Sequence, residues 1–346
     1  MITLYSEQQA LHCNIQEVLS GELVPSFEVA GRTEIVLKHI MARGLGPVIK
    51  PDHFMIESAA RVHTREYVDF LQVAWQQWQE TFPESTTQAM PYCLPVRRFR
   101  SICPDHIEGK LGYYSSDLTA AIVEGSWQAI WASVECALAG QQLIQNGERS
   151  VFSLCRPPGH HASQDQMGGY CYLNNAAIAA QAYLDNGCQR VAILDVDYHH
   201  GNGTQSIFYD RADVLFTSVH ADPSWDYPYF LGYSEETGEG DGKGFNLNLP
   251  LALNSHWSDY EPALQKALDK IAAYQPDILL ISLGLDSYEE DPISFFKLKS
   301  DNYTTMGRLI AELGLPTQFI FEGGYAVDAL GTNTANVLEG FQQYRA

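Results

Sequence analysis

The sequence predicts an α/β fold in which a parallel sheet is sandwiched by helices. From residue 151 onward, short runs rich in β-branched residues alternate with stretches of helical periodicity, and this alternation is typical of a parallel sheet. The run at 278–283 is almost entirely apolar, as expected of a strand buried on both faces. The 346 residues contain no repeat and no Ser/Gly-rich linker, so we expect a single domain spanning 1–346.

The individual elements follow from local patterns. Apolar residues at helical spacing predict a helix over 32–42 that ends near Gly44, and Thr64 is the expected cap of the next helix. Four prolines and an arginine cluster make 83–107 an irregular loop. We expect strands at 2–5, 151–154, 191–196, 214–219, 278–283 and 318–321. We expect helices at 32–42, 64–82, 127–145, 175–184, 260–273, 303–313 and 333–344.

Composition narrows the classes of partner. Forty-two acidic residues against 21 Lys plus Arg give a formal charge of −21, which disfavours nucleic acid because affinity for phosphates comes from cationic side chains. The same field concentrates small cations, although the acidity is equally explained by solubility alone.

The sequence predicts neither a membrane-spanning helix nor a secretory signal. No apolar run approaches the roughly 18 residues of a membrane helix, and the first residues lack the basic segment of a secretory signal. Seven cysteines, an odd number with no C-x-x-C pair, predict free thiols. We therefore expect no membrane partner and a cytoplasmic location.

Polar residues follow nearly every strand predicted after residue 150. Ligands bind outside the carboxyl ends of the strands in an open parallel sheet, so side chains from separate strands should meet there. The segments are 156–161, 195–203, 220–222, 284–286 and 322–325.

Three of these residues form a candidate metal site. Alternate residues of a strand share a face at about 6.6 Å, so Asp197 and His199 can face one ion, with Asp195 one step deeper and Asp286 arriving from another strand. Two carboxylates and one imidazole suit Zn²⁺ or Fe²⁺, and three protein ligands leave a position for water or substrate. The set predicts a catalytic ion.

Candidate catalytic groups surround this site. The pair His160-His161 follows a stiff Pro-Pro-Gly turn, and Asp195 and Asn202 are suited to hold the two imidazoles. Tyr325 follows two glycines, whose freedom at positive φ lets the chain turn sharply. A phenol beside a metal can donate to a developing oxyanion.

Five motifs together resemble the histone deacetylase superfamily, which shares the arginase fold. They are Arg156-Pro-Pro-Gly-His-His-Ala162, Gly168-Gly-Tyr-Cys-Tyr-Leu-Asn-Asn175, Leu194-Asp-Val-Asp-Tyr-His-His-Gly-Asn-Gly203, Gly284-Leu-Asp286 and Glu322-Gly-Gly-Tyr325. Segments 21–27 and 105–114 are similar to the bacterial branch, the acetylpolyamine amidohydrolases. The resemblance implies an arginase/deacetylase-like sheet with the active site at the C-terminal ends of its strands.

The resemblance also implies roles for individual residues. Asp197, His199 and Asp286 would bind Zn²⁺. His161 would act as general base toward the attacking water and then as acid toward the leaving amine. His160, held by Asp195, would assist electrostatically. Tyr325 would polarise the acetyl carbonyl. A narrow tunnel would be lined by Gly169, Tyr170 and Tyr227, with Ile293 near its wall.

The same resemblance implies structural K⁺ beneath the zinc. The first potassium site would use Asp195, Asp197, His199, Ser218 and Val219. The second would use backbone around Phe208, Arg211, Val214 and Phe245.

One position departs from the family pattern. Asn202 stands where many relatives carry Asp. An amide does not compensate an imidazolium as a carboxylate does, so we predict a lower pKa for His161 than in relatives with Asp.

Arginase-like ureohydrolases are the nearby alternative on the same fold. They hold two Mn²⁺ through Asp-x-His-x-Asp and Asp-x-Asp runs, whereas this chain has Gly201 and Gly284 at the positions needed for the second ion. A mononuclear site and hydrolysis of an N-acetyl amide are therefore favoured over guanidine hydrolysis.

Two questions of substrate and assembly stay open. A polycationic acetylated amine calls for carboxylates at the tunnel mouth, and Glu17, Glu108 and Asp117 are candidates, although each also fits an ordinary solvated acid. Family likeness predicts a homodimer in which long loops at about 12–30 and 83–108 narrow the entrance. The alternatives are a lysine deacetylase acting on acetylated proteins or peptides, and a non-catalytic binding module.

Overall fold

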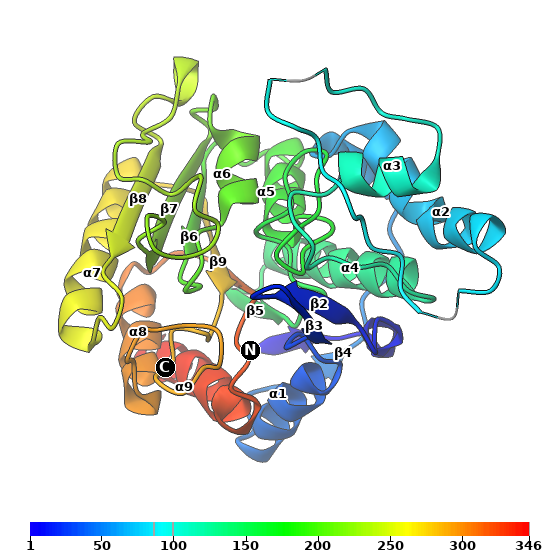
Figure 1. Ribbon diagram of the computed structural model, residues 1–346. Helices are drawn as coiled ribbons and strands as arrows, with labels where there is room; N and C mark the ends of the chain where they lie inside the picture. Colours follow the sequence, from blue (N-terminus) through cyan, green and yellow to red (C-terminus); the bar gives the residue numbers. More distant parts are fainter. Residues whose placement is uncertain (86, 99, 346) are drawn as a thin grey trace.

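In the described part of the chain, the computed structural model contains an eight-stranded parallel sheet at its centre (Figure 1). The structure describes residues 1–85, 87–98 and 100–345. The strand order is β4-β1-β5-β10-β9-β6-β7-β8, and every pairing within this sheet is parallel. The strands are β1 (Ile2–Leu4), β4 (Val48–Ile49), β5 (Ser150–Ser153), β6 (Val191–Asp195), β7 (Val214–Ala221), β8 (Asn246–Leu251), β9 (Ile278–Leu283) and β10 (Thr317–Phe321).

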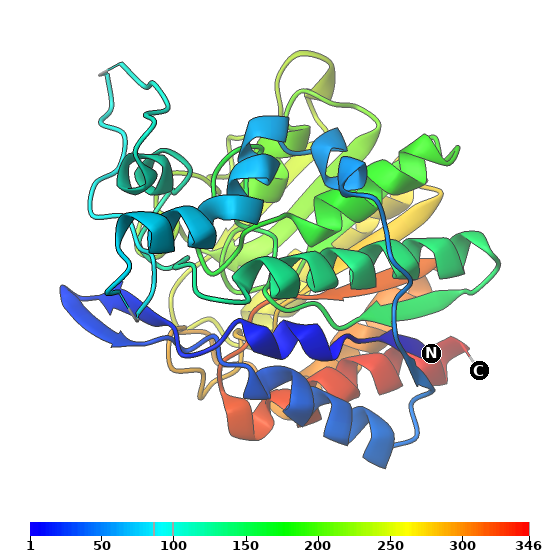
Figure 2. The same ribbon diagram turned by 90° about the vertical axis from the view of Figure 1, so that its right-hand side faces the viewer.

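Helices cover both faces of the sheet, as Figures 1 and 2 show. One face carries α2 (Arg65–Thr81), α4 (Ser126–Gln145), α5 (Asn175–Asp185) and α6 (Asn202–Phe208), with α3 (Ile107–Tyr113) packed beside α2. The other carries α1 (Gly31–Ala42), α7 (Trp257–Tyr274), α8 (Ser300–Glu312) and α9 (Val327–Arg345). Three short 3-10 segments, Glu7–Leu11, Ile56–Arg61 and Gly240–Gly242, lie in the connections.

Each face of the sheet has its own core because successive side chains of a strand point to opposite sides. In β9, Leu280 packs with α4 and α5, whereas Leu279 and Ile281 pack with α7 and α8. All six residues of β9 are buried, which explains why the run is apolar without alternation.

The predicted order of elements is confirmed. The predicted strand at 278–283 matches β9 in both bounds, and the helix expected at 32–42 matches α1 to within one residue. Gly44 follows the end of α1 with φ of 63°, as a C-terminal glycine does. Thr64 occupies the N-cap position of α2, but its side chain makes no capping hydrogen bond, so the expected capping interaction is wrong.

Three strand regions were missed. Residues 12–30, expected as a loop, contain an antiparallel hairpin of β2 (Gln16–Leu19) and β3 (Glu22–Pro25). β4 has two residues, too few to leave a pattern. β8 contains asparagine and proline, which lower the strand signal, and it lies at the sheet edge, where proline is tolerated.

The second expected loop is largely confirmed. The described residues of 83–106 form no helix or extended strand, apart from an isolated bridge between Ala89 and Ile122. Residues 86 and 99 of this loop lie outside the described part. Figure 2 shows that this loop and the β2–β3 hairpin project on the same side of the molecule.

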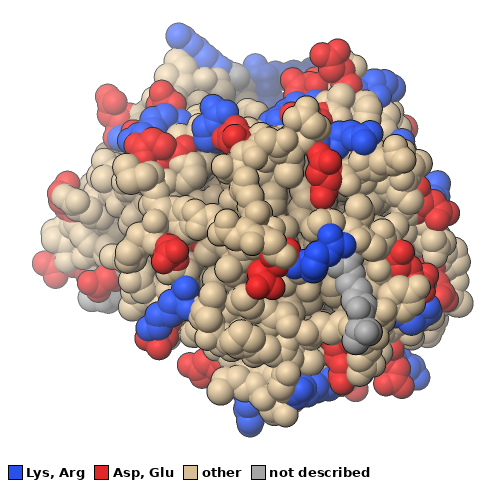
Figure 3. Space-filling model, turned by 180° about the vertical axis from the view of Figure 1, so that it is seen from behind, with Lys and Arg blue, Asp and Glu red and all other residues tan. Residues whose placement is uncertain are grey.

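The surface and the helices bear on the predicted partners. On the face turned away from Figure 1, acidic and basic side chains are interspersed (Figure 3). Among the described helices, none combines the length and the hydropathy needed to cross a bilayer. All seven cysteines are free thiols, as predicted.

The topology explains where the polar segments meet. β5, β10, β9 and β6 are four consecutive neighbours at the centre of the sheet. Because these strands are parallel, the segments that follow them emerge at one edge. His160 follows β5, Tyr325 follows β10, Asp286 follows β9 and Asp197 follows β6.

Candidate active site

Asp197, His199 and Asp286 come together as predicted. One ligand atom from each lies within 4.8 Å of the others, and all three residues are buried. His199 Nδ1 is 2.9 Å from Asp286 Oδ2 and 3.4 Å from Asp197 Oδ1. The imidazole nitrogen thus faces both carboxylates, which is an arrangement that a single cation can bridge.

Backbone amides orient the two carboxylates. The amide of Tyr198 donates to Asp286 Oδ1 at 2.8 Å, and that of Gly323 donates to Asp197 Oδ2 at 2.9 Å. Burial and the neighbouring Asp197 raise the pKa of Asp286 to about 8. Two carboxylates in contact within a buried site are electrostatically costly unless a positive charge is present. The donor set and this local negative charge both fit a divalent metal ion.

His160 is held from below by Asp195. His160 Nδ1 lies 2.9 Å from Asp195 Oδ2, and both residues are buried. Burial alone would lower the pKa of His160, but the carboxylates of Asp197 and Asp195 raise it to about 10. His160 therefore carries positive charge close to the metal-ligand carboxylates.

His161 is held differently, by Asn202. His161 Nδ1 lies 2.7 Å from Asn202 Oδ1. Because an amide oxygen only accepts, Nδ1 carries the proton and Nε2 is left as the basic nitrogen. Burial, followed by the positive charges of His160 and His199, lowers the pKa of His161 well below its usual range.

Tyr325 lies in a turn that is fixed on two sides. The Asp291 carboxylate accepts from the backbone amides of Tyr325 at 2.7 Å and Ala326 at 3.1 Å. The buried Arg32 guanidinium donates to the carbonyls of Gly324 at 2.8 Å and Glu322 at 2.6 Å. Gly324 has φ of 120°, so the sharp turn expected from the paired glycines is present.

A cavity of about 470 Å³ leads to this group of residues. His161, His199 and Tyr325 line it, together with the predicted tunnel residues Gly169, Tyr170, Tyr227 and Ile293. The Tyr227 ring meets the His161 ring edge to face, with centroids 4.9 Å apart. A side chain at position 169 would come closer than 3.0 Å to the His161 ring, so glycine is required there.

The three candidate substrate-binding acids lie in different environments. Glu17 lines the cavity, is 2 % exposed, and neither of its carboxylate oxygens has a hydrogen-bond partner in the structure. Burial raises its pKa, and the nearby Tyr170 hydroxyl and Phe27 backbone counter that shift in part. Glu17 is thus a buried acid in the cavity wall that has the Tyr170 hydroxyl and the Phe27 backbone nearby, but no donor at hydrogen-bond distance from its carboxylate oxygens.

The other two candidate acids have different surroundings. Asp117 lines the cavity, but both of its oxygens already accept hydrogen bonds, from Tyr227, Gly169 and Thr119. Glu108 lies on α3 and does not line the cavity of a single chain. Glu108 was expected because its segment resembles the polyamine branch, and Asp117 because it lies close to that segment in the sequence. Ammonium binding by either residue stays a prediction.

The residues implied for potassium lie in two groups, one toward the C-terminal ends of β6 and β7 and one at the N-terminal ends of β7 and β8. Asp195 and Ser218 are paired across β6 and β7, next to Asp197, His199 and Val219. The backbone amide of Arg211 donates to the carbonyl of Phe208, and the amide of Phe216 donates to that of Phe245, near Val214. These contacts bring the members of each group close together. Cation binding at either group stays a prediction.

Glycines enclose the metal-ligand carboxylates. A side chain at position 284 or 323 would come closer than 3.0 Å to Asp197, and one at 201 would come equally close to Asp195. The positions where a ureohydrolase carries the ligands of its second ion are therefore too crowded here for any side chain. This geometry agrees with the predicted single metal ion.

Several residues that shape the site were not predicted from the sequence. Arg32 occurs on the same helical face as Val36 and Ile40, and a charged residue on an apolar stripe is a usable signal for a buried ion pair. Its partner Glu28 lies 3.0 Å away and also binds Arg156 at 2.8 Å. Other cavity-lining residues, which local sequence does not mark, are Val18, Leu19, Leu94, Ser116, Leu118, Thr119, Asp226 and Tyr229.

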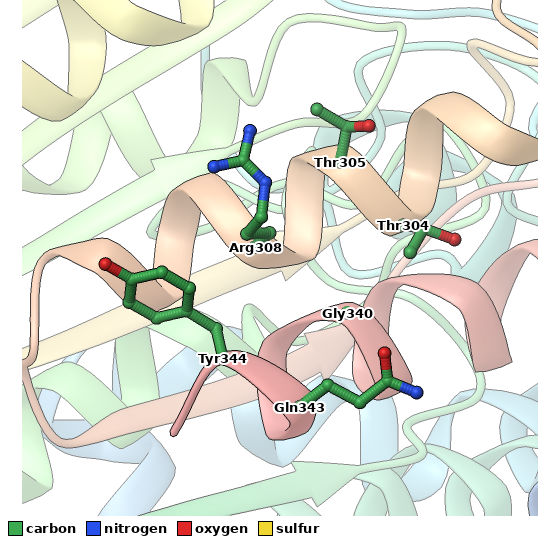
Figure 4. A pocket seen from close by; sticks show the side chains of 6 residues that line it. All are labelled: Thr304, Thr305, Arg308, Gly340, Gln343 and Tyr344. Atoms are coloured by element: carbon green, nitrogen blue, oxygen red, sulfur yellow. The ribbon is translucent and has the colours of Figure 1, made fainter. Parts of the chain in front are cut away.

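A separate surface hollow lies between α8 and α9, away from these residues (Figure 4). Thr304, Thr305 and Arg308 line it from α8, and Gly340, Gln343 and Tyr344 line it from α9. Arg308 forms an ion pair with Glu312 of its own helix. None of the predicted site residues lies in this hollow.

Comparison with known proteins places these features in a family. Residues 26–341 match the model of the histone deacetylase domain. The chain is 55% identical to acetylpolyamine amidohydrolase 2 of Pseudomonas aeruginosa, over 99% of both chains. It is 46% identical to acetylpolyamine amidohydrolase of Mycoplana ramosa, over 98% of this chain and 99% of that one. The crystal structure of acetylpolyamine aminohydrolase from Burkholderia pseudomallei superposes with a TM-score of 0.95 at 37% identity, covering 99% of each chain.

Proposed function

Because the chain belongs to the histone deacetylase family, we propose that it removes acetyl groups from small acetylated diamines and polyamines by hydrolysing the N-acetyl amide bond. The family assignment rests on the domain match and on relatives aligned over almost the whole chain. These relatives bear the names of acetylpolyamine amidohydrolases, which supports an acetylated amine as the substrate class.

The proposed cofactor is a single Zn²⁺ or Fe²⁺ ion held by Asp197, His199 and Asp286. Two carboxylate oxygens and one imidazole nitrogen make a donor set that suits either metal, and the buried carboxylates support a divalent charge. A bound ion of this kind polarises the amide carbonyl and lowers the pKa of water. One proposed K⁺ ion would stabilise the ends of β6 and β7 beneath this site, and the other would stabilise the starts of β7 and β8.

The chain's own residues supply the proton chemistry. Nε2 of His161 is free to take a proton from the attacking water and to return it to the departing amine, since Asn202 keeps the Nδ1 proton in place. The Tyr325 hydroxyl stays protonated because burial raises its pKa, so it is available to donate to the oxygen that becomes negative. His160 adds positive charge nearby, held by Asp195.

The buried Glu17 is the observation that supports a cationic substrate. An unpaired carboxylate in a buried position costs free energy, and Glu17 lines the same cavity as His161 and Tyr325. A substrate ammonium group entering the cavity would supply the charge and the hydrogen-bond donors that this side chain lacks. The cavity therefore favours acetylated amines that carry a second, charged nitrogen.

A substrate panel on enzyme of measured metal content tests the proposal. We expect efficient turnover of acetylated putrescine, cadaverine and spermidine and weak turnover of acetyl-lysine peptides. In Glu17→Gln, KM for an acetylated diamine should rise roughly tenfold to a hundredfold, since a hydrogen-bonded charge contact is lost. KM for a neutral N-alkylacetamide should stay the same.

Two outcomes of this panel contradict the proposal. A preference for acetyl-lysine peptides over every acetylated diamine would indicate a protein deacetylase. If the metal-loaded protein turned over no substrate, and the His161→Ala substitution made no difference to this, the protein would be a binding module.

We also propose that the protein forms a homodimer through the region around the cavity mouth. Apolar side chains are exposed there, with Leu19 45 % and Tyr229 49 % exposed, beside Leu23 at 56 % and Phe230 at 88 %. Clustered exposed apolar residues at a rim are typical of interaction surfaces. Gel filtration showing a fully active monomer would contradict this assembly.

A further inference from the structure

The Asp117 carboxylate lies between two walls of the cavity. Its Oδ2 atom accepts a hydrogen bond from the Tyr227 hydroxyl at 2.7 Å and from the backbone amide of Gly169 at 2.9 Å. These two donors lie 58 positions apart in the sequence. The carboxylate therefore links two segments of the cavity wall that are distant in the sequence.

The second oxygen of Asp117 is engaged as well. Its Oδ1 atom accepts from the backbone amide of Thr119 at 2.9 Å and from the Thr119 hydroxyl at 2.8 Å. The Thr119 hydroxyl oxygen in turn accepts from the amide of Tyr170 at 3.3 Å. Both carboxylate oxygens thus have two donors each, in contrast to Glu17 on the same cavity, whose oxygens have none.

The two walls that Asp117 joins both touch His161. The Tyr227 ring packs edge to face on the His161 ring, and any side chain at Gly169 would come closer than 3.0 Å to it. The Tyr227 ring also meets the ring of His199, with centroids 6.0 Å apart. Movement of either wall would change both the width of the passage and the packing around His161.

We propose that Asp117 is a positioning residue that fixes the Tyr227 ring against the Gly169 backbone and thereby makes the passage selective for straight-chain acetylated amines. This inference rests on the proposed function, and it assigns Asp117 a role other than ammonium binding. Tyr227 contributes through its hydroxyl, which is the donor in the contact, and through its ring, which forms the wall.

The conservative variant Tyr227→Phe isolates the contact. It keeps the aromatic ring and removes the hydroxyl, so residue 227 loses its hydrogen bond to Asp117 but keeps its apolar surface. We expect selectivity, measured as the ratio of kcat/KM for N-acetylputrescine to that for an analogue branched beside the amide nitrogen, to fall about tenfold, the size of one hydrogen bond to a charged group. Asp117→Asn, which replaces one acceptor oxygen by a donor, should lower the same ratio.

A matched control separates this role from loss of stability. Tyr183→Phe also removes a buried tyrosine hydrogen bond, from Tyr183 to Gln318 at 2.9 Å, but on α5 outside the cavity. We expect Tyr183→Phe to lower the melting temperature and to leave the selectivity ratio unchanged. Metal content and the melting temperature are measured for all variants.

Several results would overturn the inference. If Asp117 bound the substrate ammonium, removing the competing Tyr227 hydroxyl would lower KM for straight and branched charged substrates alike, and the selectivity ratio would not fall. An unchanged ratio in both Tyr227→Phe and Asp117→Asn, or an equal loss for straight and branched substrates, also contradicts it. Failure of the proposed function is distinct, since the native chain would then turn over neither substrate.

Discussion

At the scale of single residues, two adjacent histidines acquire different properties from their partners. His160 is bonded to the Asp195 carboxylate, and nearby carboxylates raise its pKa, whereas His161 is bonded to the Asn202 amide, and burial lowers its pKa. One ring is thus suited to hold positive charge and the other to accept a proton, although their backbones are neighbours.

Replacing Asn202 by Asp is expected to change the pH dependence of the reaction. A carboxylate beside Nδ1 favours the imidazolium, so the pKa of His161 should rise. Because His161 must be neutral to accept a proton, activity is lost as pH falls through its pKa. The acidic limb of the kcat/KM profile should therefore move to higher pH in Asn202→Asp, by about 1 unit or more for a close carboxylate. An unmoved limb would show that Asn202 does not set this pKa.

At the scale of elements, strand ends and glycine-containing turns place the site. β5, β10, β9 and β6 end side by side, and the segments after them carry the residues with chemical function. Glycines let these segments approach one another closely, as at Gly284, where β9 leads into Asp286.

The substitution Gly284→Ala tests this close approach. The added methyl group would come closer than 3.0 Å to the Asp197 carboxylate and backbone. We expect metal affinity to fall roughly tenfold to a hundredfold, the range seen when groups supporting a metal ligand are disturbed. Metal content after dialysis against a graded chelator series measures the effect.

Gly31→Ala is the matched control for this measurement. A side chain at position 31 meets nothing within 4 Å, so its metal content should equal that of the native chain. Full metal retention in Gly284→Ala would show that the β9 turn tolerates a side chain beside Asp197.

At the scale of the whole molecule, the two cores bury several histidines away from the active site. Burial lowers the pKa of His63 and His220 to about 4, and burial with the Arg156 charge lowers that of His12 to about 3. Their pKa in the unfolded chain is about 6.5. Below that pH, the unfolded chain binds protons that the folded chain does not bind.

Stability should therefore fall as pH decreases from about 6.5 toward 4. By linkage, each of these three histidines is expected to lower the free energy of unfolding by roughly 1 kcal/mol between pH 7.5 and 5.5. In His63→Gln, which keeps an acceptor for the Asn174 amide but does not titrate, the decrease should be smaller by about the same amount. Denaturant unfolding at the two pH values measures it, and an equal decrease in both proteins would contradict the assignment.

The expected elements and metal ligands were accessible from sequence for a physical reason. Strands buried on both faces leave apolar runs such as 278–283, and a parallel sheet brings the residues after those runs to one edge. Asp197, His199 and Asp286 could thus be grouped before any coordinates were considered. The β2–β3 hairpin and β8 were missed because short or edge strands carry weak patterns.

The sequence by itself determined the α/β class, the order of the main elements and which residue types meet beyond the strand ends. Only the tertiary structure decided how each acid is used. Glu17, Glu108 and Asp117 are all acidic residues that the sequence does not distinguish by role. In the structure Glu17 is buried without a hydrogen-bond partner, Glu108 does not line the cavity, and both oxygens of Asp117 accept hydrogen bonds. The physical reason is that the partners come from distant segments, as Tyr227 does for Asp117 across 110 positions, and local patterns do not encode such contacts.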